Sequence, residues 1–280
     1  MSVGSVRPWI VSDELWSLIE SLLPEPGPKL VAGRPRMPDR QALCGILFVL
    51  HTGIQCGYLP HELGFGSGMT CWRRLAAWNE AGAWDELHLV LLKKLRSAKQ
   101  LDWPRAVIDS SHVRAARRGP KAVQARSTAR PGSKHHVLTD GHCIPLAVSL
   151  TGGNRNDVAQ LLPLLDKVQA VVGRVGRPGR RPDMLFADRG YDHDKYRRLL
   201  RQRGSRPAIA ERGQQHGTGL GTFRWVVERT ISWLHGFRRL RIRWARERNK
   251  TARLRVRSPC GGRLGRRGGS RLVCVAAAGE

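Results

Sequence analysis

Apolar residues recur at helical spacing in four segments of the first hundred residues. The pattern predicts helices over residues 12–23, 39–50, 70–82 and 84–95, separated by turns and loops rich in Pro and Gly. The first three begin at residues that can cap a helix, which are Ser12 or Asp13, Asp39, and Thr70. Four short helices joined by loops predict a small all-α unit, compatible with a helix-turn-helix arrangement.

After Pro104 the pattern changes to short apolar runs, which predict strands. The expected strands cover residues 106–108, 133–140, 143–152, 184–187 and 206–210, and Asp140-Gly141 is a hairpin signal between two of them. Helices are expected over residues 156–168 and 193–204, followed by a long helix over 223–246. This order predicts a mixed α/β sheet with helices on its faces.

Three acidic residues stand at chemically suggestive places in this sheet. Two expected strands end in an aspartate, Asp109 and Asp188, and the long helix adds Glu228. Carboxylates from sheet ends and a nearby helix can converge and supply hard oxygen ligands for one or two Mg²⁺ ions, which support phosphodiester cleavage. An aspartate after an apolar strand also commonly starts a turn, so a structural role stays open at each position.

Composition adds a strong basic bias. Lys and Arg number 49 against 22 Asp and Glu, a net charge of +27, which predicts a polyanionic partner such as nucleic acid. Residues 1–100 hold 11 basic and nine acidic residues, whereas residues 101–280 hold 38 and 13. This asymmetry predicts a domain boundary near residues 101–105. The hydrophobic content of 41% excludes a disordered polycation.

Targeting and redox signals predict a cytoplasmic, nucleoid-associated protein. Apolar runs are too short for a membrane span, and the first 13 residues contain no apolar signal core. No membrane partner is expected. The six cysteines form no CxxC pair and are expected as buried thiols in a reducing compartment.

Five segments in order resemble transposases of bacterial insertion sequences, of the IS-5 group of the DDE superfamily, which have an RNase H-like catalytic domain. The resemblance covers about residues 8–246, and the segments are WRRLAAWNEAGAWDEL, VIDSSHVRA, GSKHHVLTDGHCIPLAVSLTGGNRNDV, FADRGYD and FRWVVERTISWLHGFRRLRIRWAR. It implies that Asp109, Asp188 and Glu228 are catalytic and bind two Mg²⁺ ions, for which Mn²⁺ can substitute.

The implied function is a DNA transposase, which cleaves the ends of an insertion sequence and transfers strands into target DNA. The implied partners are double-stranded DNA, as terminal inverted repeats and as target, and a second copy of the chain when DNA is bound. One alternative is a catalytically inactive remnant that acts only by binding DNA. Another is a nuclease of the same fold that cleaves but does not join strands.

Several basic and aromatic residues are candidates for DNA contact, each with a structural alternative. Arg73 and Arg74 lie on the third expected helix, where solvated arginines of an ordinary bundle are the alternative. Lys134, His135 and His136 can touch phosphate or form a solvated strand face. The resemblance adds the following positions near the glutamate: Trp225, Arg229, and His235 or Arg238.

Four other polar residues have weaker assignments. His112 could assist proton transfer near Asp109. Asp157, Asp192 and Asp194 are better explained as helix caps than as metal ligands.

The sequence therefore divides into three parts. Residues 1–100 are expected to form a helical DNA-binding domain, and residues 101–248 an RNase H-like catalytic domain. Residues 249–280 are crowded with Arg and Gly and lack helical periodicity, which indicates a disordered or frameshifted tail. A shifted frame would remove the closing helix, which leaves a destabilised or inactive copy as an alternative. A basic arm that binds DNA is the functional alternative for this tail.

Overall fold

The computed structural model describes residues 7–25, 27, 35–115, 124–125, 128–171, 181–211, 213 and 221–243. The basic tail expected over residues 249–280 lies outside these ranges. Within them, no helix is both long enough and apolar enough to cross a membrane.

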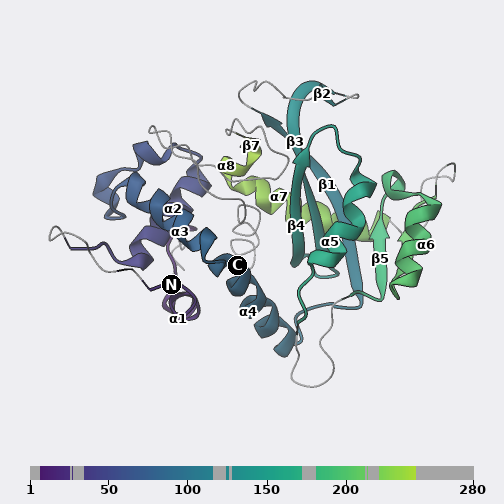
Figure 1. The fold of residues 1–280 in the computed structure, drawn as a ribbon, viewed down its shortest axis with the longest axis horizontal. Coiled ribbons are helices and arrows are strands. Elements are labelled where there is room, and N and C mark those ends of the chain that lie inside the picture. Colours follow the sequence, from purple (N-terminus) through teal and green to yellow (C-terminus); the bar gives the residue numbers. More distant parts are fainter. Residues whose placement is uncertain are drawn as a thin grey trace, which may run out of the picture.

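The four helices expected near the N-terminus are confirmed. They are α1 (Asp13–Glu20), α2 (Asp39–Thr52), α3 (Gly68–Glu80) and α4 (Ala83–Ser97), and the short 3-10 helices η1 (Cys56–Tyr58) and η2 (His61–Leu63) lie between α2 and α3. Ser12 caps α1, because its hydroxyl accepts a hydrogen bond from the Leu15 amide at 3.3 Å. In Figure 1 α1, α2 and α3 form one end of the molecule, the sheet forms the other, and α4 runs from the first toward the second.

Two of the expected caps are wrong. Pro38, which makes no side-chain cap, precedes α2, so Asp39 lies inside the first turn. Ser67 caps α3 with extended backbone dihedrals and accepts from the Thr70 amide at 3.2 Å, so Thr70 lies in the first turn instead. In each case the cap is an extended residue that precedes the first helical one, so the cap lies one to three residues before the expected position, and α3 begins two residues earlier than predicted.

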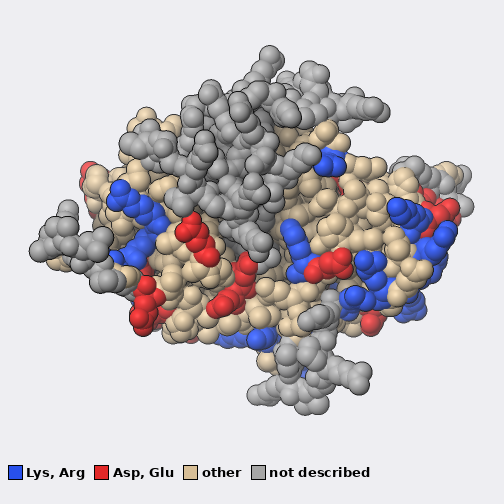
Figure 2. All heavy atoms as spheres, viewed as in Figure 1, with Lys and Arg blue, Asp and Glu red and all other residues tan. Residues whose placement is uncertain are grey.

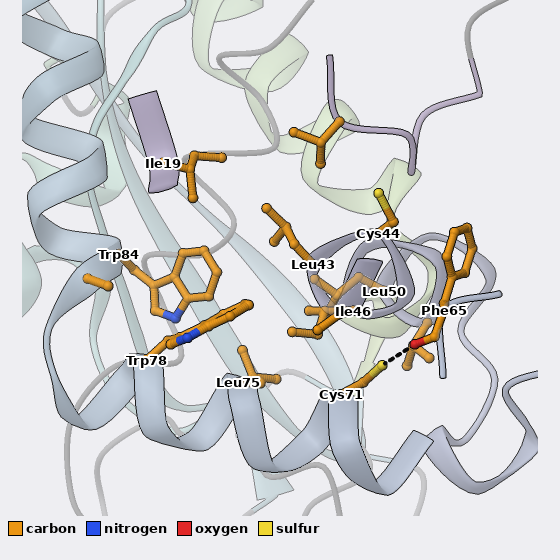
Figure 3. Packing of buried hydrophobic residues seen from close by; sticks show 14 of the residues in the cluster. Ile19, Leu43, Cys44, Ile46, Leu50, Phe65, Cys71, Leu75, Trp78 and Trp84 are labelled. Carbon is orange, nitrogen blue, oxygen red and sulfur yellow. Dashed lines mark hydrogen bonds between the residues drawn. The ribbon is translucent and has the colours of Figure 1, made fainter. Parts of the chain in front are cut away.

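The helical end has its own core (Figure 3). Trp78 of α3 and Trp84 of α4 meet edge to face with ring centroids 5.7 Å apart. The Cys71 thiol donates to the Phe65 carbonyl at 3.4 Å. Among the described residues the free cysteines are all buried, as expected: Cys44, Cys56, Cys71 and Cys143. The other two cysteines, at positions 260 and 274, lie outside the described ranges.

The predicted mixed sheet is present. Its strands are β1 (Arg105–Ala115), β3 (Thr128–Asp140), β4 (Pro145–Gly152), β5 (Met184–Ala187) and β6 (Arg206–Ile209), in the order β4-β3-β1-β5-β6. The pieces β2 (Gln124–Ala125) and β7 (Ile242–Arg243) pair with β3 and β1. The hairpin β3–β4 is antiparallel, as is β1–β3, whereas β1–β5 and β5–β6 are parallel.

The expected end of the first strand at residue 108 is wrong. β1 continues to Ala115, because β3 pairs with it from Ala106↔Asp140 to Arg114↔Gly132. Asp109 therefore lies within the strand rather than after it. Polar residues continue the ladder here because backbone pairing, not side-chain polarity, defines the strand.

Helices cover both faces of the sheet. One face carries η3 (Asp157–Gln160), α5 (Leu161–Lys167), η4 (Arg189–Tyr191) and α6 (Asp194–Gln202), and its core includes Ile108 and Leu200. The other face carries α7 (Gly221–Gly236), whose buried Val226 and Val227 pack near Val107. Figure 1 shows α5 in front of the sheet and α7 behind it.

The long final helix ends sooner than predicted. α7 stops at Gly236, Phe237 has extended backbone dihedrals, and a separate short helix α8 (Arg238–Arg241) follows. This break turns α8 against the end of α2. The Arg239 guanidinium donates to the carbonyls of Gly53 and Ile54, each at 3.4 Å, and is buried.

Candidate active site

Strand register brings the two candidate aspartates together. β1 and β5 run parallel, with Val107 opposite Phe186 in the last of their pairs. Two residues further along each chain come Asp109 and Asp188, on the sheet face that α7 covers. Asp188 follows β5 directly and caps η4, because its carboxylate accepts the Gly190 amide at 2.9 Å. The Asp109 carboxylate accepts the Ser110 amide at 2.7 Å.

Glu228 reaches this face from α7. The buried Val226 and Val227 fix the helix against β1 and β5, which leaves Glu228 on its exposed side. Arg224, one turn earlier, pairs with Glu228, with Nε 2.7 Å from Oε1. Both side chains are more than half exposed, so this pair contributes little to stability.

The charges of the three carboxylates interact. Burial raises the pKa of Asp109 from 3.8 to about 6; the Ser110 amide opposes this rise, and the charge of Asp188 adds to it. Smaller effects come from Arg224, which lowers the pKa, and Glu228, which raises it. Asp109 thus lies within electrostatic range of both partners that the sequence suggested. Within the described ranges, neither Asp109 nor Asp188 forms an ion pair.

The donor set suits a hard divalent cation, although the site is not assembled. Carboxylate oxygens are the ligands that Mg²⁺ prefers, and a bound cation would offset both the burial and the neighbouring negative charges that raise the pKa of Asp109. In the part of the chain that the structure describes, no three His, Cys, Asp or Glu side chains stand close enough to hold a metal. Glu228, held by Arg224, must turn toward the aspartates to complete such a site.

Tyr191 is a site residue that the sequence analysis missed. Its side chain is buried, and its phenol interacts with Ser110 of β1. Burial raises the pKa of Tyr191 above its usual range, and the charges of Asp157, Asp109 and Asp188 add to this effect. The available signal was its place in FADRGYD, three residues after Asp188.

A second polar group lies near Tyr191. The sequence pattern allows either Asn156 or Asp157 as the cap of this segment; the Asn156 side chain caps η3, and Asp157 pairs with Lys134 at 2.9 Å. His136 is fully buried, with Nδ1 3.8 Å from the Asp157 carboxylate. Burial lowers the pKa of His136 to about 4, so it is neutral at neutral pH. Lys134 therefore contacts a carboxylate rather than forming the solvated face considered above.

The candidate DNA contacts around Glu228 differ in exposure. Trp225 is 51% exposed, and Arg229 stacks over the Trp233 ring at 4.8 Å. Arg238 is exposed on α8. His235 lies 3.3 Å from the Ser111 hydroxyl and is half-buried, which lowers its pKa.

The remaining candidates are scattered. Arg73 is exposed on α3, but the expected exposure of Arg74 is wrong, because Arg74 pairs with Asp39 at 3.2 Å and is 15% exposed. Burial lowers the pKa of His135 to about 4, so its ring carries no charge toward phosphate at neutral pH. His112 is exposed, and its position three residues after Asp109 on β1 places the two side chains on opposite faces of the strand.

The two aspartates that follow FADRGY do not cap α6. Asp192 pairs with Arg197 at 2.8 Å, and Asp194 lies in the first turn of α6. The residue at the cap position is His193, whose side chain makes no capping hydrogen bond.

Comparisons with known proteins identify transposase domains in this chain. Residues 11–88 match a family model described as a putative transposase of the IS4/5 family, and residues 104–257 match the transposase DDE domain. The DDE-domain match and the observed sheet together confirm the predicted RNase H-like α/β fold.

Two relatives come from an insertion element of Burkholderia cepacia. A putative transposase for insertion sequence element IS402 is 54% identical over 142 residues, which cover 51% of this chain and 66% of the relative, just under two thirds of its length. An IS402 uncharacterized 16.2 kDa protein is 54% identical over 123 residues, which cover 43% of this chain and 84% of that protein.

Among solved structures, the comparison finds a chain of the cryoEM structure of the simian T-cell lymphotropic virus intasome in complex with PP2A regulatory subunit B56 gamma. Its TM-score is 0.29 at 14% identity, and the match covers 68% of this chain and 58% of that one.

Proposed function

Because this chain belongs to the DDE transposase family of bacterial insertion sequences, we propose that it is a DNA transposase that cleaves element ends and joins them to target DNA. The proposal rests on the placement of Asp109 and Asp188 two residues beyond the paired Val107 and Phe186 of neighbouring parallel strands, with Glu228 on the helix that covers the same face. The charges of Asp188 and Glu228 add to the rise that burial causes in the pKa of Asp109. Carboxylates from neighbouring strands and a covering helix that interact electrostatically are typical of a site that binds divalent cations.

The carboxylates would hold two Mg²⁺ ions, for which Mn²⁺ can substitute. When bound, such ions activate the attacking water or 3′-hydroxyl and stabilise the leaving oxygen. The chain itself positions the ligands: backbone amides of Ser110 and Gly190 orient Asp109 and Asp188. The exposed pair with Arg224 adds little free energy, so little opposes the rotation of Glu228 toward the aspartates.

The proposed DNA partners are terminal inverted repeats and target DNA, with two copies of the chain acting on two ends. Residues 1–100 would read the ends, with Arg73 exposed on α3 for phosphate or base contact and Arg74 available only if it leaves Asp39. Residues 101–248 would carry out catalysis. Trp225, Arg229 and Arg238 would contact DNA beside the carboxylates, whereas Lys134 and His135 would shape the site from β3.

The decisive experiment replaces Asp109 with Asn, which keeps the shape and removes the charge. Cleavage of element-end DNA with Mg²⁺ should fall at least about 100-fold, because the ligand supports several kcal/mol of transition-state stabilisation. Binding of the same DNA should be retained, since phosphate contacts lie elsewhere. Gel assays of cleavage and binding on the same samples measure both.

Asp183→Asn is the matched control, because Asp183 is exposed and lies five residues before Asp188. It should cleave like the original protein. Wild-type protein that binds ends but cuts with neither Mg²⁺ nor Mn²⁺ would replace the proposal with a non-catalytic DNA-binding protein. Cleavage without joining would indicate a nuclease.

A further inference from the structure

The helix α6 has one side that packs on the sheet and an opposite side that carries exposed cations. Leu200 is buried against the sheet core, and Tyr196 packs partly against the same cluster. On the opposite side Lys195, Arg198 and Arg201 are exposed, at three-residue spacing. Three-residue spacing places these cations as neighbours along one face of the helix.

The cations on this face lack compensating acids. Arg197 pairs with Asp192 at 2.8 Å, and Arg203 lies 3.7 Å from Asp166. By contrast, across the described ranges no ion pair within 4.0 Å involves Lys195, Arg198 or Arg201. Figure 2 shows Lys and Arg side chains gathered over this end of the molecule.

Arg206 extends the same charge onto the sheet. It begins the edge strand β6, directly after the loop that leaves α6, and its side chain is exposed without an ion pair in the described structure. Like charges held close together repel each other, so this arrangement costs stability unless a polyanion neutralises it.

The position of this surface separates it from the helical end. α6 begins six residues after Asp188, so it is tied to the candidate catalytic edge of the sheet. In Figure 1, α6 and the N-terminal helices lie at opposite ends of the long axis, with β1 between them. A duplex held at α3 and a duplex held at α6 would therefore occupy different parts of the protein.

We propose that Lys195, Arg198, Arg201 and Arg206 bind the phosphate backbone of a DNA segment other than the one read by the N-terminal helices. This proposal rests on the proposed transposase function. α6 also exposes Asp194 and Gln202, but its three exposed cations are the groups that suit phosphate, so we assign the contact to the DNA backbone rather than to base edges. Target DNA and the flank of an element end share this chemistry, and the experiment distinguishes them.

The test is a triple variant of the full chain: Lys195→Gln, Arg198→Gln and Arg201→Gln. Binding of a scrambled duplex is measured as a function of salt. Loss of three phosphate contacts should flatten the log–log salt slope by about 2.7, at about 0.9 per contact. The matched control is a triple variant with the same loss of charge at another place, near the end of α4. Its substitutions are at exposed lysines: Lys93→Gln, Lys94→Gln and Lys99→Gln.

Two further arms identify the DNA segment. If the surface holds target DNA, the triple variant should cleave ends normally but lose strand transfer. If it holds the flank, affinity should fall for end duplexes that carry flanking DNA and not for those that stop at the end. A charge-preserving variant, Lys195→Arg with Arg198→Lys and Arg201→Lys, should restore binding in either case.

An unchanged slope in the triple variant, or an equal change in the control, would overturn the surface assignment. This outcome is separate from failure of the proposed function, because wild-type protein that never cleaves can still show the slope difference.

Discussion

The burial of Asp109 makes its negative charge costly before any cation is bound. Its pKa rises from 3.8 to about 6, so between these values the folded chain holds a proton that the unfolded chain has lost. The free energy of unfolding contributed by this group therefore falls as pH rises through that window. At 1.36 kcal/mol per unit, the loss at pH 7 is at most about 3 kcal/mol.

We expect Asp109→Asn to be more stable than the original protein at pH 7 in the presence of a chelator, and to lose this advantage near pH 4. Urea unfolding at both pH values measures the difference between the two proteins, which cancels the titration of all other groups. The exposed Asp183→Asn should show no such pH-dependent difference. An unchanged stability at pH 7 would mean that the Asp109 carboxylate is better solvated than its burial implies.

For individual residues, the sequence indicated which acidic side chains are candidates for the site, but it did not indicate which side chains surround them. Asp109, Asp188 and Glu228 could be selected because of where they fall relative to apolar runs. The roles of Tyr191 and Asp157 could not, because they depend on how η3 and η4 meet β1 and β3 in space. No spacing in the chain encodes that Lys134 points toward Asp157.

Among the secondary-structure elements, α3 and η1 show how closely two backbones can approach. A Cβ atom added at Gly68 would lie 1.5 Å from the Cys56 carbonyl oxygen, so only glycine fits there. Gly68→Ala should reduce the free energy of unfolding by about 1–3 kcal/mol or more, as expected for overpacking. Thermal and urea unfolding measure this loss.

Gly57→Ala is the control within η1, because a Cβ atom at Gly57 would meet nothing within 4 Å. It should leave the unfolding midpoint nearly unchanged. Equal effects of the two substitutions would indicate that the 3-10 helix, rather than the close approach, limits stability.

Most elements were predictable where the apolar pattern is strong, as in the helical spacing of α4 and the apolar run of β5. The residues at which the helices and strands end were less predictable. The second half of β1 is polar, and it is a strand only because β3 pairs beside it along the whole length. The break after Gly236 likewise reflects the packing of α8 on α2, and the apolar pattern of residues 223–246 does not predict it.

At the scale of the whole molecule, Arg239 joins the helical end to the sheet. Its guanidinium satisfies two carbonyls at the end of α2, Gly53 and Ile54, which are left without helical partners. Arg239→Ala should cost about 1–3 kcal/mol, because it leaves buried acceptors unsatisfied. Calorimetry should then show the helical end melting before the sheet, where the original protein melts in one step.

Arg238→Ala is a suitable control for this junction. Its Cβ atom is the part that approaches Gly53, and alanine retains it, while the rest of the side chain is exposed. One melting step should remain. Two steps in both variants would show that the junction depends on α8 as a helix rather than on the Arg239 guanidinium.

The contact between α8 and α2 also has an evolutionary consequence. Phe237 meets His51 edge to face at 6.1 Å, next to the Arg239 contact with Gly53. A hybrid made by recombination between relatives, with a crossover between residues 98 and 104, would pair one parent's α2 with another's α8. Such an exchange can therefore transfer DNA-end specificity only if both parents have the same contact residues between α2 and α8. Otherwise residues 237–239 must come from the same parent as α2.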